Sequence, residues 1–207
     1  MGLALWLVPA RPQLPTIQAV QSELRRLHPS TPRFEPHVTL LAGFDPAVHG
    51  DAARIWEVTR AEVGKWRATR KRGEMKGALD VKLADVTTRN MFFQCILASL
   101  HKDADLMALN SALRTAFDLI TSRPPYFPHL SLLYGDLTPT QIQDTIQTLL
   151  DRGIFERHAG ESEGVVLVGD GKEEDEVRVD ALELVHVELW DCEGRPEEWK
   201  QVHSLTL

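Results

Sequence analysis

Cysteine, positive charge and long apolar runs are all scarce in this sequence, and each scarcity excludes a class of protein. The two cysteines, Cys95 and Cys192, allow one disulfide at most, so the chain is no disulfide scaffold and we expect reduced thiols. The formal net charge of -7 argues against a protein that holds nucleic acid by neutralising many phosphates. A small anionic substrate in a polar pocket remains compatible with this charge.

The apolar N-terminal run covers only Leu3 to Val8, meets Pro9 and has no basic segment before it. It is too short for a signal-peptide core or a membrane span. We therefore expect a soluble, intracellular, cytoplasmic protein without a transmembrane segment, a monomer that forms no stable complex with nucleic acid. With 43% hydrophobic and 26% charged residues in 207, the composition suits one globular domain, residues 1–207.

Apolar periodicity and punctuating prolines predict a mixed order of helices and strands. Residues 138–141, TPTQ, match a capping box with proline in the first turn, which predicts a helix to about Asp151. The other expected helices cover residues 17–27, 51–66 and 103–120, and the expected strands cover residues 3–8, 37–41, 79–83, 91–100, 129–134, 164–168 and 181–190. This order is typical of an α+β protein with helices against largely antiparallel sheets.

The two halves of the chain carry a repeated segment of eight residues. Residues 36–43, PHVTLLAG, align without gaps with residues 128–135, PHLSLLYG, and five of the eight positions are identical. An aromatic residue, Phe34 or Tyr126, lies three positions before each histidine. We infer a duplicated unit, which predicts two lobes that face each other across a pseudo-twofold cleft.

Each copy predicts a histidine and a hydroxyl on one face of a strand. Because side chains alternate between faces, His37 shares a face with Thr39, and His129 shares a face with Ser131. Across a cleft, one neutral imidazole can accept a proton from water while a protonated one donates to a leaving oxygen. The hydroxyls can donate to the oxygens of a phosphodiester. This scheme needs neither a metal nor another cofactor.

Two other interpretations of the same residues are a structural role and a zinc site. Packing alone gives no reason for both copies to keep a polar pair. Threonine and serine are poor zinc ligands, and neither strand has a cysteine or carboxylate at ligand spacing. Acid-base catalysis is therefore the favoured interpretation.

The sequences HVTL and HLSL resemble the paired motifs of the 2H phosphoesterase superfamily, and PHLSLLYGD resembles the second motif of its fungal and plant cyclic phosphodiesterase branch. The resemblance implies a bilobal fold of two antiparallel sheets flanking a cleft, with helices outside, and is compatible with Golgi association. It implies hydrolysis of ADP-ribose 1″,2″-cyclic phosphate and of nucleoside 2′,3′-cyclic phosphates to 2′-phosphates. It also implies that His37 and His129 transfer protons, that Thr39 and Ser131 bind phosphate, and that Tyr134 contacts the substrate.

Two rival functions share these motifs. One is a phosphodiesterase or ligase-like enzyme that acts on RNA ends, and the other is a non-catalytic module that binds nucleotides. The net charge of -7 favours a small nucleotide over RNA, and the presence of both histidines favours catalysis.

The roles of several residues stay open at this point. A regular strand would turn Tyr134 away from Ser131, so only a bend near Gly135 would bring it into the cleft. Trp6 either stacks on a base or belongs to the core, and the basic stretch 65–76 is either a solvated loop or a flap that meets a second phosphate. We assign His129 as the base for water and His37 as the acid for the leaving 3′ oxygen, although the near symmetry of the halves permits the reverse.

Overall fold

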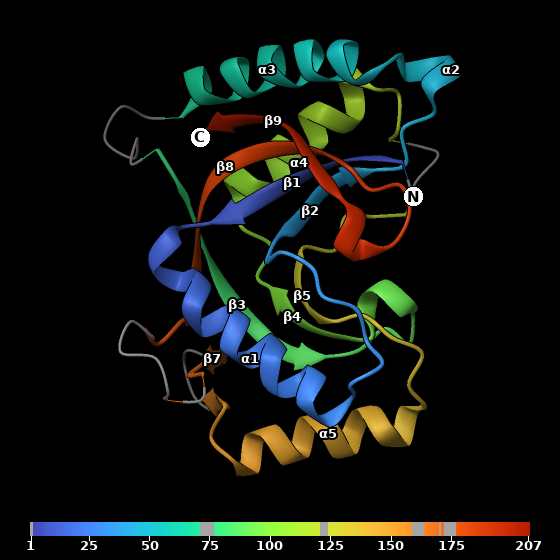
Figure 1. Ribbon diagram of the computed structural model, residues 1–207. Helices are drawn as coiled ribbons and strands as arrows, with labels where there is room; N and C mark the ends of the chain where they lie inside the picture. Colours follow the sequence, from blue (N-terminus) through green and yellow to red (C-terminus); the bar gives the residue numbers. More distant parts are fainter. Residues whose placement is uncertain (1, 71–76, 121–123, 159–163, 170, 172–176) are drawn as a thin grey trace.

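The structure is a computed structural model that describes residues 2–70, 77–120, 124–158, 164–169, 171 and 177–207. The helices are α1 (Leu14–Leu27), α2 (Pro46–His49), α3 (Ala52–Thr69), α4 (Ala104–Ala116) and α5 (Pro139–Asp151). The strands are β1 (Leu3–Pro9), β2 (Val38–Ala42), β3 (Leu79–Thr87), β4 (Ile96–Leu100), β5 (His129–Leu133), β6 (Phe155–His158), β7 (Gly164–Leu167), β8 (Ala181–Asp191) and β9 (Lys200–Thr206). Figure 1 shows the strands between two outer layers, with α3 and α4 at one end and α1 and α5 at the other.

Within the described residues, seven strands form one sheet in the order β1-β2-β5-β4-β3-β8-β9, and β6 pairs with β7 in a separate hairpin. β1 also pairs with β8, so the antiparallel pairings close into a ring. The pairing between β2 and β5 is the shortest in the ring, because its register contains one pair, Val38 opposite Leu130. Two antiparallel halves, one built around β1 and β2 and one around β4 and β5, therefore meet at this point. The expected α+β architecture is confirmed.

The helices are exchanged between the halves. α1, which precedes β2 in the chain, packs on β5, whereas α4, which precedes β5, packs on β2. Each of these helices sends a buried amide to the strand beneath it. Gln21 Nε2 lies 3.5 Å from the carbonyl oxygen of Ser131, and Asn110 Nδ2 donates to the carbonyl oxygen of Leu40 at 2.7 Å. Each repeated segment is thus held by the helix of the other repeat.

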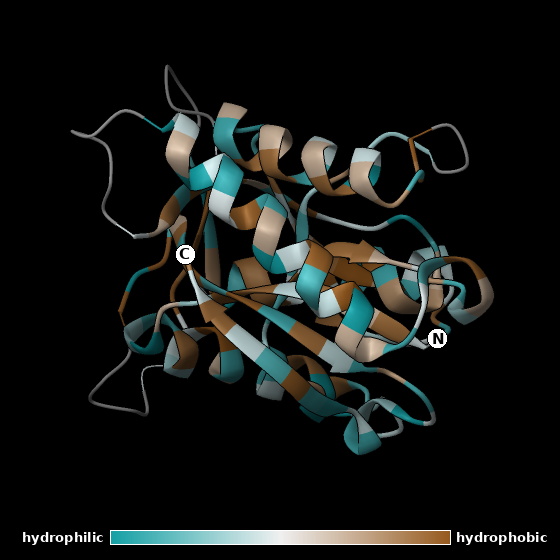
Figure 2. Ribbon diagram, turned by 90° about the horizontal axis from the view of Figure 1, so that it is seen from above, coloured by the Kyte–Doolittle hydropathy of each residue, from teal (hydrophilic) through white to brown (hydrophobic). Residues whose placement is uncertain are grey.

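The apolar side chains form two clusters. The larger one joins the sheet to the helices, and it includes Ile17, Val20 and Leu24 of α1, all fully buried as their spacing predicts. The helices in Figure 2 carry hydrophobic and hydrophilic residues side by side, as amphipathic helices do. The smaller cluster is mostly aromatic and consists of Ala4, Trp6, Phe34, Tyr134, Cys192 and Trp199. It lies beside the repeated segments.

Several predicted elements have different bounds. The strand expected over residues 91–100 begins only at Ile96, because Phe92–Gln94 form a 3-10 turn. The helix expected to reach residue 120 ends at Ala116, since Asp118 adopts a φ of 53°, which an α-helix cannot accommodate. The strands β6 and β9 were not predicted, because β6 has four residues and β9 is largely polar.

Cys95 and Cys192 are both free and buried. No described helix has the length and apolar character that crossing a membrane requires.

The bond from Asn110 to β2 can be tested by mutation. Asn110→Leu keeps the volume but leaves the buried carbonyl of Leu40 without its donor, so we expect the free energy of unfolding to fall by about 1 to 3 kcal/mol. Urea unfolding measures the change, with Ser111→Ala, at the next, exposed position of α4, as the matched control. If Asn110→Leu is as stable as the control, the amide does not support the strand.

Candidate active site

A β-bulge in β5 places Tyr134 on the same face as Ser131. The register with β4 shifts by one residue between Ser131 and Leu133, so Leu132 has no partner of its own. Beyond this additional residue, each side chain points to the face opposite to the one it would have in a regular strand. Tyr134 therefore points toward the cleft, and the bend that this requires is at Leu132 instead of near Gly135.

β2 has the same irregularity at the matching position. Its register with β1 shifts between Thr39 and Leu41, so Leu40 is the additional residue there. The bulge places Ala42 on the face of Thr39, where the second copy has Tyr134. The repeated strands are thus alike in backbone, but only one of them presents an aromatic hydroxyl to the cleft.

The pairing of β2 with β5 brings the four predicted polar side chains together. Because the strands are antiparallel and meet through the residues that follow the two histidines, His37 lies beside Ser131 and Thr39 lies beside His129. His37, His129 and Ser131 are buried, and Thr39 is half-buried. The sequence predicts these residues on two strands, and the structure brings the two strands side by side.

The backbone orients both imidazoles in the same way. Nδ1 of His37 lies 2.7 Å from the carbonyl oxygen of Glu35, and Nδ1 of His129 lies 2.8 Å from that of Phe127. A carbonyl oxygen only accepts, so the proton of each neutral ring is on Nδ1 and Nε2 is left as an acceptor. Each ring thus keeps the nitrogen that can exchange protons with a substrate.

Aromatic rings enclose His37. The ring of Trp6 stacks on its imidazole with a centroid distance of 3.5 Å and an angle of 4°. Trp190 also stacks on Trp6, at 4.2 Å, and Trp6 is only 2% exposed. The hydroxyl of Tyr134 lies 3.4 Å from Nε2 of His37, and Phe34 stacks on Tyr134 at 3.7 Å. Trp6 thus holds the imidazole of His37 in place, and the indole of Trp6 is itself covered by His37 and Trp190.

Burial lowers the pKa of both histidines. Desolvation lowers the pKa of His37 to about 3, against the bond to the Glu35 carbonyl, which raises it, and a charge on His129 lowers it further. Desolvation also lowers the pKa of His129, where the Phe127 carbonyl raises it and the charge of Arg89 lowers it. Both rings are therefore neutral near pH 7 in the substrate-free cleft, and repulsion between them opposes protonation of both rings at once.

The hydroxyl groups of the cleft have different surroundings. Ser131 Oγ donates to the carbonyl oxygen of Phe93 at 3.1 Å, so it must rotate to donate to a phosphate oxygen. The hydroxyl of Tyr126 donates to the backbone carbonyl of Thr39 at 3.0 Å, so it stabilises the backbone of β2. Burial raises the pKa of Tyr134, so its hydroxyl keeps its proton and can donate.

The basic stretch contributes nothing to this cleft where the structure describes it. Residues up to Thr69 continue α3, which packs on α4 and β9, so the prediction of a loop is wrong for residues 65–69. Lys65 pairs with Glu62, and Arg70 pairs with Asp105. The remainder of the expected flap, residues 71–76, lies outside the described residues.

Metal independence stays a prediction from the sequence. Among the residues that the structure describes, no three histidine, cysteine, aspartate or glutamate side chains are grouped so that they could hold a metal ion.

Sequence reasoning missed two tryptophans beside the cleft. Trp190 stacks on Trp6, and Trp199 lies 5.8 Å from it, centroid to centroid. Both come from the C-terminal segment, residues 181–207, which has no counterpart in the repeat. The only trace in the sequence is a pair of tryptophans nine residues apart at the two ends of WDCEGRPEEW.

Comparison with known proteins finds a matching family and several relatives of this chain. A family model described as cyclic phosphodiesterase-like protein matches residues 1–207. A 2′,3′-cyclic-nucleotide 3′-phosphodiesterase of Kluyveromyces lactis is 25% identical over 232 residues, which cover 100% of this chain and 99% of the relative. A cyclic phosphodiesterase of Arabidopsis thaliana is 28% identical over 135 residues, 65% of this chain and 66% of the relative.

Among solved structures, the apo form of E. coli LigT matches with a TM-score of 0.51 and 13% identity, covering 100% of this chain and 96% of that one. At this identity the likeness shows the fold alone. It agrees with the α+β 2H phosphoesterase fold expected from the sequence.

The buried histidine makes stability depend on pH. The pKa of His37 is about 3 in the folded protein and about 6.5 when unfolded, so the folded state binds fewer protons between these values. Its contribution is complete above about pH 6.5 and is lost as the pH falls toward 3, by up to about 1.4 kcal/mol per pH unit. We expect urea unfolding between roughly pH 7 and pH 5 to show this loss.

His37→Asn should flatten that slope, and His101→Asn, at an exposed position, is the control for the same substitution. Equal slopes in the wild-type protein and His37→Asn would mean that His37 accepts a proton in the folded state.

Proposed function

The chain belongs to the family of cyclic phosphodiesterase-like proteins, and we propose that it hydrolyses cyclic phosphodiesters of small nucleotides. The proposal rests on one observation above all: two imidazoles, each with Nδ1 bound to a backbone carbonyl, meet where β2 pairs with β5. The names of the yeast and plant relatives support the same reaction. The proposed substrates are nucleoside 2′,3′-cyclic phosphates and ADP-ribose 1″,2″-cyclic phosphate.

In the proposed reaction, water attacks phosphorus, the bond from phosphorus to the 3′ oxygen breaks, and a nucleoside 2′-phosphate is released. One histidine takes the proton of the attacking water, and the other gives a proton to the 3′ oxygen. ADP-ribose 1″,2″-cyclic phosphate would yield ADP-ribose 1″-phosphate in the same way. No step requires a cofactor or a partner protein.

We assign His129 as the base and His37 as the acid. His129 is 9% exposed and His37 is 3% exposed, so His129 is the ring that a water molecule reaches more readily. His37 is neutral in the free cleft, and it gains its proton when the anionic phosphodiester binds. A negative charge acts strongly on an enclosed ring, because little water screens the interaction, and it raises the pKa of His37 from about 3.

Three hydroxyl groups are proposed to hold the phosphate. Thr39 and Ser131 flank the histidines, and Tyr134 lies 3.4 Å from Nε2 of His37. Fixed donors that face the non-bridging oxygens stabilise the charge that develops there during the attack. Trp6 is proposed to hold the imidazole of His37 instead of stacking on a base, because His37 and Trp190 already stack on it.

The first test is the reaction itself. We expect 2′,3′-cyclic AMP to give only the 2′-phosphate in phosphorus NMR, with EDTA present throughout. His37→Ala and His129→Ala should each lower kcat/KM by several orders of magnitude, and the double variant should be little worse than the worse single one. A product with a 3′-phosphate, or activity that EDTA removes and zinc restores, would contradict the mechanism.

The same assay separates the rival functions. An oligonucleotide that ends in a 2′,3′-cyclic phosphate should be a poorer substrate than the mononucleotide, because the polar side chains of the cleft are enclosed and the net charge is -7. The opposite ranking would favour an enzyme of RNA ends. Nucleotide binding without turnover would favour a binding module.

The roles of the two histidines can be told apart with a second substrate. A diester of 4-nitrophenol has a leaving group that needs no protonation, so it bypasses the acid but still requires the base. We expect this substrate to restore much of the activity of His37→Ala and little of that of His129→Ala. Rescue of His129→Ala alone would reverse the assignment.

A further inference from the structure

A buried hydrogen-bond donor lies beside the histidine cleft without an acceptor. Trp199 is 8% exposed, and within the part of the chain that the structure describes its Nε1 atom is buried and has no hydrogen-bond partner. Two other tryptophans do have acceptors: Trp66 donates to the carbonyl of Asp105 at 3.0 Å, and Trp190 donates to Glu188 at 2.7 Å. An indole nitrogen can only donate, and an unpaired buried donor destabilises the fold.

Trp199 lies among the rings that enclose His37. Its centroid is 5.8 Å from that of Trp6 and 6.1 Å from that of Tyr134. Trp6 stacks on the imidazole of His37, and the hydroxyl of Tyr134 lies 3.4 Å from Nε2 of the same ring. Trp199 is therefore one ring away from the imidazole at which the phosphodiester is proposed to react.

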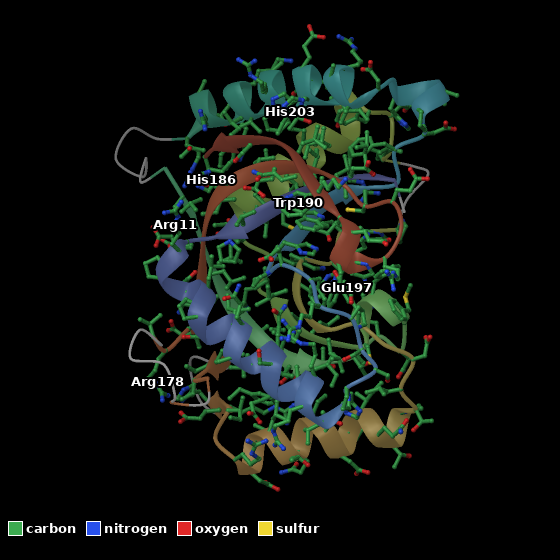
Figure 3. All side chains as sticks on the ribbon, viewed as in Figure 1. Arg11, Arg178, His186, Trp190, Glu197 and His203 are labelled. Carbon is green, nitrogen blue, oxygen red and sulfur yellow. The ribbon has the colours of Figure 1, made fainter. Side chains whose placement is uncertain are left out.

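The two residues before Trp199 are held by hydrogen bonds of their side chains. The carboxylate of Glu198 accepts from the backbone nitrogen of Arg195 at 2.8 Å, and Glu197 accepts from the backbone nitrogen of Arg33 at 3.1 Å. Arg33 belongs to the connection that leads from α1 to the first histidine. Figure 3 shows Glu197 on the link between β8 and β9, with Trp190 on the strand before it. The indole is thus positioned by bonds that do not involve a substrate.

A phosphodiester supplies the kind of acceptor that this donor requires. Its two non-bridging oxygens can accept more hydrogen bonds than the hydroxyl groups of Thr39, Ser131 and Tyr134 can donate, since each hydroxyl donates one. An uncharged donor held rigidly in a buried site stabilises developing negative charge effectively. We propose that the Nε1–H group of Trp199 donates to a non-bridging phosphate oxygen of the substrate, which rests on the function proposed above. Trp199 is then a further substrate-binding residue.

Trp199→Phe tests the inference, because it removes the N–H group and keeps an aromatic ring. We expect kcat/KM for 2′,3′-cyclic AMP to fall by about 10-fold to 100-fold, the scale for a hydrogen bond to a charged group. The melting temperature should fall less than in Trp66→Phe, because both variants lose the same volume but only Trp199→Phe also removes an unpaired buried donor. Trp66→Phe is the matched control, and it should lose stability but keep kcat/KM, because its indole bonds to the protein outside the cleft.

A direct readout uses the indole resonances. The ¹H–¹⁵N signal of Trp199, assigned by its loss in Trp199→Phe, should move downfield as inorganic phosphate is added to the wild-type protein up to saturating competitive inhibition. The signal of Trp66 should stay in place.

A Trp199 signal that stays fixed while phosphate inhibits, or an unchanged kcat/KM in Trp199→Phe, would overturn the inference while leaving the proposed function standing. Failure of the wild-type protein to hydrolyse any cyclic nucleotide would overturn the proposed function instead.

Discussion

The pairing of β2 with β5 is the contact on which the cleft depends, because it sets four polar side chains side by side. A single register pair, Val38 with Leu130, joins these two strands, and on the other side of the ring β8 joins the halves by pairing with both β1 and β3. The helices add to this, since α1 packs on β5 and α4 packs on β2, so that each half is attached to the other through a complete helix. The geometry of the histidines is therefore a property of the whole fold rather than of two short strands.

Enclosure by this fold has two opposing electrostatic effects. It removes water from the imidazole of His37 and lowers its pKa to about 3, which works against an acid catalyst in the free protein. The same lack of water strengthens the attraction between that ring and a bound anion. In the proposed mechanism, substrate binding and protonation of His37 are thus coupled, and the ring holds its proton only while a phosphodiester is bound.

The repeated segment made the core of the site predictable, because strand alternation places His37 with Thr39 and His129 with Ser131 in any regular strand. Alternation failed at Tyr134, where a bulge adds one residue. Each copy carries a pair of leucines after the hydroxyl residue, and a regular strand would expose the second of them to the cleft, so the doublet is the trace of the bulge in the sequence. Trp199 left no comparable trace, since its position depends on a C-terminal segment that the repeat does not contain.

Duplication by itself would give two equivalent histidines, and equivalent rings have no preferred direction of proton transfer. The surroundings remove this equivalence. Where the second copy presents Tyr134, the first presents Ala42, and the hydroxyl of Tyr134 reaches across to His37. Trp6 covers the same imidazole, whereas His129 has Phe127 beside it and is the more exposed ring. In the proposed mechanism, the shared backbone therefore fixes where the two protons are exchanged, and the aromatic residues that the copies do not share determine which ring meets water and which ring is buried against the substrate.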